Sequence, residues 1–232
     1  EERKELLKGV DLTLKSVSII LGDGLRNVEE KVESFTGAKH CIGLNSGTDA
    51  LMMSLWSAGI GKGDEVLHPT ISFIATTGAI VHVGAKPIFC EVDENGLLDT
   101  NKLESKITSK TKAIMPVHWS GKICDMVRIL EICKEYNLTL IEDSAQAMGA
   151  YFNGIHGGRF AVSGAFSCHP LKNLSALGDG GFLITDDEEI AKKVRLYRNH
   201  GLESRDNVTL FGVNSRLDAL NAEVLTYRLK KL

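Results

Sequence analysis

The sequence has no apolar run of the roughly 18 residues that a membrane-spanning helix needs. Its first five residues, Glu1 to Glu5, are all charged, so the apolar stretch of a signal peptide is missing as well. From these absences we expect a cytoplasmic protein without a membrane partner.

Closely spaced metal ligands and massed basic charge are also lacking. The five cysteines form no CxxC pair, which argues against a zinc ribbon and against a disulfide framework. The seven histidines show neither HExxH nor a comparable array, so no metal site is predicted. The 27 basic residues are scattered and the net charge is −3, so nucleic acid is not an expected partner. The composition favours small-molecule partners.

The pattern that is present alternates short β-rich runs with helical periodicity. Two helices are predicted over Thr48–Ala58 and Asp125–Tyr136, where apolar residues recur at three- and four-residue spacing. The alternation predicts an α/β domain with a mostly parallel, seven-stranded sheet whose strand-end loops gather along one edge. The expected strands are His40–Leu44, Glu65–His68, Pro87–Val92, Ala113–Val117, Leu138–Glu142, Gly164–Ser167 and Gly181–Thr185.

The last residues, Leu229 to Leu232, read as the middle of a helix without a Gly or Pro stop signal. We therefore expect the chain to be part of a longer protein.

One cluster places a lysine just after a predicted strand. Phe166 to Ser167 ends the strand, Pro170 turns the chain, and Lys172 precedes the Gly-rich segment Gly178–Gly181. A lysine that forms an imine must spend part of its time as a neutral amine, which a desolvated strand-end site favours. A solvated surface position is the ordinary alternative for a lysine, and the surrounding pattern argues against it.

Two further clusters also sit at strand ends. Leu140–Gln146 is an apolar strand that ends in acids, and Asp143 could pair with a protonated ring nitrogen; taken alone it could equally cap a helix or bind a metal. Gly43–Ala50 is a strand, a turn and a helix start, where free N–H groups and the Thr48 hydroxyl suit a phosphate. Such residues also cap helices that bind nothing.

These clusters, in this order, resemble the DegT/DnrJ/EryC1/StrS family of pyridoxal-phosphate (PLP) sugar aminotransferases, which have the fold type I architecture. The resemblance covers nearly the whole chain. Its matching blocks are Asn45–Leu51, Gly59–Val66, Ser72–Thr76, Val83–Pro87, Pro116–His118, Ile141–Gln146, Ser167 with Pro170 and Lys172, Arg198–Gly201 and Asn214–Asp218.

The resemblance implies a three-layer αβα domain and PLP as cofactor. Residues 1–232 would form the PLP-binding large domain with an N-terminal helical segment, and the small C-terminal domain of the family would be absent. Lys172 would hold the cofactor as an imine and move protons, while Asp143 would face the pyridine nitrogen and Gln146 the phenolic oxygen. The remaining implied cofactor contacts are Phe73, stacked on the ring, and Gly47, Thr48 and Ser167, at the phosphate.

The resemblance also implies an obligate homodimer with shared active sites, because Asn214 matches an asparagine that reaches the neighbouring subunit's cofactor phosphate. Arg216 could meet an anionic substrate group or simply pair with Asp218. His169 stands where the family usually has Tyr or Phe, and it could contact the substrate or merely fill that space. Cys168 likewise replaces a common Phe.

The implied reaction is transamination of a nucleotide-linked keto sugar with an amino acid donor, L-glutamate, in polysaccharide or antibiotic-sugar synthesis. Relatives with histidine in place of the lysine are dehydratases, and Lys172 argues against that. A non-catalytic PLP-binding regulator is a further alternative. An NAD-type oxidoreductase is disfavoured, because Gly59–Gly63 follows a helix and precedes a strand, the reverse of the Rossmann order. We interpret Gly59–Gly63 as a helix C-cap and turn.

Overall fold

The computed structural model describes residues 1–16 and 18–232, and a seven-stranded sheet lies at its centre. The strand order is β1-β9-β8-β5-β4-β2-β3. β9 runs antiparallel to both β1 and β8, while the other pairings are parallel, so the predicted mostly parallel sheet is confirmed. The strands are β1 (His40–Leu44), β2 (Glu65–Pro69), β3 (Lys86–Cys90), β4 (Thr111–Ile114), β5 (Thr139–Asp143), β8 (Ser163–Ser167) and β9 (Gly181–Thr185).

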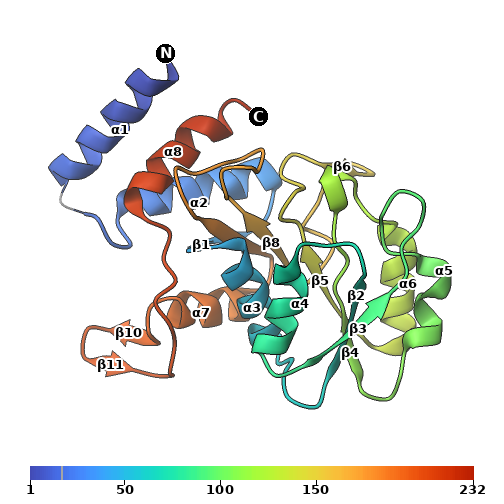
Figure 1. The fold of residues 1–232 in the computed structure, drawn as a ribbon. Coiled ribbons are helices and arrows are strands. Elements are labelled where there is room, and N and C mark those ends of the chain that lie inside the picture. Colours follow the sequence, from blue (N-terminus) through green and yellow to red (C-terminus); the bar gives the residue numbers. More distant parts are fainter. Residues whose placement is uncertain (17) are drawn as a thin grey trace.

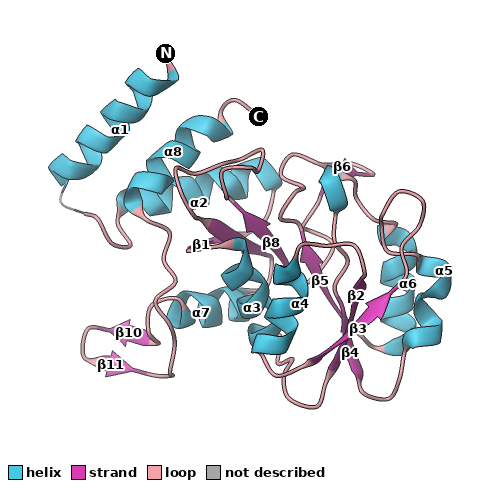
Figure 2. Ribbon diagram, in the orientation of Figure 1, coloured by secondary structure: helices cyan, strands magenta, loops and turns pink. Residues whose placement is uncertain are grey.

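Helices cover both faces of this sheet (Figure 1). α3, α4 and α7 pack on one face, and α2, α8, α5 and α6 pack on the other. Their bounds are α1 (Glu2–Ser16), α2 (Asp23–Thr36), α3 (Gly47–Ser57), α4 (Ile74–His82), α5 (Thr100–Leu103), α6 (Met126–Tyr136), α7 (Glu188–Tyr197) and α8 (Ala219–Leu229). Two short hairpins, β6 (Tyr151–Phe152) with β7 (Ile155–His156) and β10 (Leu202–Ser204) with β11 (Asn207–Val208), lie outside the sheet (Figure 2).

The strand sequences explain why both faces are covered. Successive side chains of a strand point to opposite faces, so a strand buried on both sides is apolar throughout. In β9, Leu183 packs with α3 and α7, whereas its neighbours Phe182 and Ile184 pack with α2. In β2, Val66 packs on the face covered by α3 and α4, and Leu67 packs on the face covered by α5 and α6. The three-layer αβα architecture is therefore confirmed.

Most predicted elements differ from the structure by one or two residues at their ends. The largest difference is β4, which ends at Ile114 rather than at Val117. Pro116 has no backbone N–H to continue the ladder, and the chain returns to the sheet only through an isolated bridge between Val117 and Asp143. The predicted helix near residue 232 is α8, and it ends at Leu229.

The glycine-rich segment between α3 and β2 is a turn, as predicted. Gly59 and Gly63 have φ of 78° and 98°, the left-handed region that favours glycine. No helix among residues 1–16 and 18–232 is long and apolar enough to cross a membrane.

Candidate functional site

A cavity of about 430 Å³ lies at the carboxyl edge of the parallel strands. It is bounded by the residues that follow β1, β2, β5 and β8, where open α/β sheets bind ligands. Eight of the ten predicted site residues line it: Gly47, Thr48, Phe73, Asp143, Gln146, Ser167, His169 and Lys172. The folding of the chain therefore brings together side chains that are 125 positions apart in sequence, from Gly47 to Lys172.

Asp143 forms the floor of the cavity. Its side chain, on a residue only 4% exposed, accepts hydrogen bonds from the Thr76 hydroxyl at 2.6 Å and from the Ala145 N–H at 3.2 Å. Burial raises the pKa of this carboxyl, although both hydrogen bonds oppose the shift. Among the described residues, no cationic side chain lies within 4 Å to form an ion pair with it. A buried carboxylate without an ion-pair contact suits a cationic ligand group.

The Thr76 hydroxyl belongs to a short relay that orients Asp143. Thr76 gives its only proton to Asp143, so the hydrogen bond between Ser72 and Thr76 has the Ser72 hydroxyl as donor. Ser72 and Thr76 lie one turn apart around the start of α4. No role was predicted for either residue, because Thr76 meets a carboxylate 67 positions further along the chain.

Gln146 is held by the backbone of the loop after β4. The Ser120 N–H donates to a side-chain oxygen of Gln146 at 2.9 Å. An N–H can bond only to the oxygen of the amide, so this contact identifies Oε1 and leaves the NH₂ group as the donor available to the cavity.

The amino terminus of α3 forms another side of the cavity. Ser46 caps the helix by accepting the Asp49 N–H at 3.1 Å, and the first-turn amides of Gly47 and Thr48 have no helical carbonyl to bond. Gly47 is required here, because a Cβ would lie 2.7 Å from Cβ of Ser167. The helix start and Ser167 thus make one compact polar surface, which suits an anion.

Lys172 lies on a tight turn that follows β8. Its N–H donates to the His169 carbonyl at 2.8 Å, and the His169 N–H donates to the Ser167 hydroxyl at 3.3 Å. The Leu171 N–H donates to Nδ1 of His169 at 3.2 Å, so Nε2 of that ring carries the proton. Lys172 is partly buried in the cavity wall rather than solvated on a surface remote from any pocket.

Phe73 lies at the rim, at the N-cap of α4, and it is 66% exposed. It lines the cavity, with an aromatic face available to a flat ligand.

Asn214 and Arg216 do not line the cavity. Asn214 is exposed and forms an isolated backbone bridge with Asn199. Nη1 of Arg216 donates to Oδ1 of the same Asn199 at 3.1 Å. Among the described residues Arg216 makes no ion pair with Asp218, so the alternative role as the partner of Asp218 is not seen, and the role in substrate binding stays a prediction. The fold instead brings Asn199 within reach of the guanidinium.

Two proteins of similar sequence show what this chain resembles. A protein of Acidithiobacillus ferrooxidans named UDP-N-acetyl-3-dehydro-α-D-glucosamine 3-aminotransferase is 45% identical over 224 residues, which are 96% of this chain and 61% of that protein. A protein of Geobacillus stearothermophilus named pleiotropic regulatory protein is 40% identical over 231 residues, 99% of this chain and 62% of that protein. The chain thus spans about three fifths of the length of these relatives.

Solved structures agree with the sequence relatives. DesV of S. venezuelae in complex with a ketimine intermediate superimposes with a TM-score of 0.96 at 38% identity, over 98% of this chain and 62% of that one. NtdA of Bacillus subtilis with bound cofactor PMP gives 0.93 at 33% identity, over 99% of this chain and 53% of that one. The family model described as the DegT/DnrJ/EryC1/StrS aminotransferase family matches residues 1–232, and the chain belongs to that family.

Proposed function

We propose that this protein is a PLP-dependent aminotransferase that moves an amino group from an amino acid to a keto sugar attached to a nucleotide. The observation that carries the proposal is one cavity that joins a lysine amine, a buried carboxylate and a helix amino terminus. The curated relative from Acidithiobacillus ferrooxidans is named as an aminotransferase of a UDP-linked dehydro sugar, which supports this substrate class.

The residues of the cavity fit PLP in three separate ways. The amides at the start of α3, the Thr48 hydroxyl and Ser167 suit the phosphate. Asp143 suits the protonated pyridine nitrogen, because a cationic ring relieves the cost of burying its carboxylate. Lys172 suits the aldehyde carbon, and the exposed face of Phe73 suits the flat ring.

When bound, PLP supplies an electron sink that stabilises negative charge at the α-carbon of the donor. The Lys172 amine would act as the base that moves the proton between this α-carbon and C4′ of the cofactor. Asp143 would keep the ring nitrogen protonated, and the Gln146 NH₂ group, left available by the Ser120 contact, would donate to the phenolic oxygen. The donor that we propose is L-glutamate, and the product is an amino sugar for polysaccharide or antibiotic-sugar synthesis.

Replacement of Lys172 tests the proposed reaction. A full-length Lys172→Ala protein should release 2-oxoglutarate from glutamate far more slowly than wild type, because no other amine lines the cavity among the described residues. Release at the wild-type rate would contradict the proposal. A screen of nucleotide keto sugars with glutamate as donor then identifies the acceptor. A yellow protein whose absorbance changes with borohydride separates a PLP enzyme from an oxidoreductase.

A regulatory role without turnover is a second candidate, since one curated relative has a regulatory name. This candidate and the aminotransferase both predict bound PLP, so the two differ only in turnover. Wild-type protein that binds PLP but converts no keto sugar in the screen would favour the regulator. Lys172 disfavours the dehydratase chemistry of relatives that have histidine at this position.

We further propose that residues 1–232 form the PLP-binding large domain and that two copies share their active sites. Asn214 lies outside the cavity of its own chain and is exposed, as is Phe211 at 98%. Both features are expected of a segment covered by a second subunit. Mixing inactive Asn214→Ala and Lys172→Ala proteins should restore part of the activity if the sites are shared, and no recovery would contradict this arrangement.

A further inference from the structure

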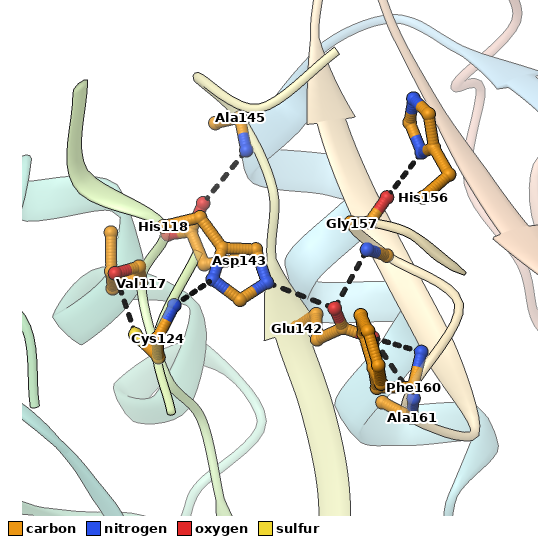
Figure 3. Close-up of polar contacts among 11 residues, drawn as sticks. Val117, His118, Cys124, Glu142, Asp143, Ala145, His156, Gly157, Phe160 and Ala161 are labelled. Atoms are coloured by element: carbon orange, nitrogen blue, oxygen red, sulfur yellow. Dashed lines mark hydrogen bonds and ion pairs between the residues drawn. The ribbon is translucent and has the colours of Figure 1, made fainter. Parts of the chain in front are cut away.

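A histidine and a glutamate form a fully buried pair directly behind the cavity floor. Nε2 of His118 and Oε1 of Glu142 are 2.9 Å apart, and both residues have 0% exposure (Figure 3). Glu142 immediately precedes Asp143 in the chain, and neither member of the pair lines the cavity. The pair therefore cannot touch a substrate, and any effect on the reaction must pass through its neighbours.

The hydrogen bonds assign the protons of the pair. The Cys124 N–H donates to Nδ1 of His118 at 3.3 Å, so Nδ1 is the acceptor and Nε2–H is the donor to Glu142. Glu142 also accepts backbone N–H groups from Gly158 at 2.7 Å, Phe160 at 2.8 Å and Ala161 at 2.9 Å. Four donors around two oxygens stabilise an ionised carboxylate.

Through Glu142, these bonds tie two separate segments to the end of β5: the loop of residues 116–124 and residues 157–161 (Figure 3). Gly157 lets the second segment pack closely on the loop of residues 116–124, because a Cβ there would lie 2.6 Å from Cδ1 of Ile123. A buried charge that accepts four hydrogen bonds has one preferred position, so the end of β5 is held in a fixed position relative to the two segments.

The same loop holds both functional side chains of this edge. The Asp143 N–H donates to the Pro116 carbonyl at 3.0 Å, and the His118 N–H donates to the Asp143 carbonyl at 3.1 Å. Two residues later, the Ser120 N–H orients the amide of Gln146. Movement of His118 would therefore displace Asp143 and Gln146 together.

We propose that His118 and Glu142 are positioning residues that hold the Asp143 carboxylate and the Gln146 amide where they would meet the pyridine nitrogen and the phenolic oxygen of the cofactor. This inference rests on the proposed function. It assigns the pair neither an acid–base role nor contact with substrate. It explains why a charged residue lies in the sheet interior, where an apolar side chain would otherwise be expected.

The test compares three substitutions in the full-length protein. His118→Leu removes the donor to Glu142, whereas His118→Gln keeps an amide N–H that can reach it. His68→Leu is the matched control, because His68 is equally buried at 0% exposure, its ring nitrogens have no hydrogen-bond partner, and it does not line the cavity. For each protein we would measure thermal unfolding without PLP, the dissociation constant of PLP, and the ¹⁵N signal of the bound pyridine nitrogen.

We expect His118→Leu to weaken PLP binding by roughly 10- to 100-fold, the range seen when supporting hydrogen bonds around metal ligands are removed. Its ¹⁵N signal should shift toward the unprotonated nitrogen, because Asp143 no longer faces the ring. His118→Gln should restore most of both properties, and His68→Leu should leave both unchanged. A general loss of stability would not move the nitrogen signal.

Wild-type PLP affinity and an unchanged nitrogen signal in His118→Leu would overturn the positioning role, and so would equal changes in His68→Leu. If His118→Leu does not fold, His118→Asn replaces it, because its shorter amide stays polar but cannot reach Glu142; the same two results then decide. Failure of wild-type protein to bind PLP would instead overturn the proposed function, so the two failures are distinguishable.

Discussion

The two walls of the cavity differ in burial and in hydrogen bonding. The inner wall, Thr76, Asp143 and Gln146, is buried or partly buried, and each of its side chains has a hydrogen-bond partner. The outer wall, Phe73, His169 and Leu171, is exposed, with Leu171 at 87%. The inner wall is organised before any ligand binds, as an electrostatic site requires. The outer wall is free to contact a ligand.

Asp143→Ala should produce the largest effect and would sharpen this contrast. Close opposite charges near a protein surface attract by about 4 kcal/mol, and each 1.4 kcal/mol is a factor of ten. We therefore expect the half-reaction with glutamate to slow by roughly 10³-fold and PLP to be lost more readily on gel filtration. The control is Asp125→Ala, which removes an exposed cap of α6 and costs only about 1 kcal/mol of stability.

An undiminished half-reaction in Asp143→Ala would show that the inner wall does not hold the ring nitrogen. Slowing of the same size in Asp125→Ala would show that the assay reports stability rather than the site.

His169→Phe should have a smaller effect, confined to substrate. Nε2–H of His169 is the only hydrogen-bond donor of this side chain that can reach into the cavity, since Nδ1 accepts the Leu171 N–H. Loss of one neutral hydrogen bond costs about 1 kcal/mol, so KM for the keto sugar should rise by roughly fivefold with PLP affinity unchanged. Steady-state kinetics and a PLP titration check this. Loss of PLP from His169→Phe would show that the outer wall also holds the cofactor, which would contradict the distinction between the two walls.

The smallest expected effect is a pH-dependent change in stability without PLP. Burial raises the pKa of Asp143 above its ordinary value of 3.8, so the folded state holds this proton to higher pH than the unfolded state. As pH rises above about 4, ionisation destabilises wild type, whereas Asp143→Asn does not titrate at this position. The stability of Asp143→Asn relative to wild type should therefore increase from pH 4 to pH 8.

Urea unfolding at several pH values measures this trend, and added PLP should reverse it by supplying the missing positive charge. A constant difference between the two proteins across this range would mean that the Asp143 carboxyl carries no burial cost.

Predictions from the sequence succeeded where the chemistry lies in one short segment. Gly43–Ala50, Leu140–Gln146 and Phe166–Lys172 each combine a strand with a polar turn, and all three reach the cavity. The glycine turn after α3 was predictable for the same reason. The roles of these residues in catalysis remain predictions.

Predictions were incomplete where a partner lies far away in the chain. Arg216 was expected either to meet an anionic substrate group or to pair with Asp218, whereas in the fold its guanidinium donates to Asn199. Thr76 and His118 carried no signal of their contacts, since threonine and histidine are common in many settings. The early end of β4 could have been anticipated from Pro116, which lacks an N–H.

The sequence by itself determined where strands and helices follow one another along the chain, the turns at the strand ends and the residue types offered to a cofactor. Backbone propensities and side-chain chemistry act locally, so these features are encoded in short segments. Only the tertiary structure decided which of those residues meet: that Thr76 orients Asp143, that Ser120 holds Gln146, and that His118 and Glu142 support both. Such contacts depend on the order of the strands within the sheet and on how the loops pack at its edge, which no local pattern encodes.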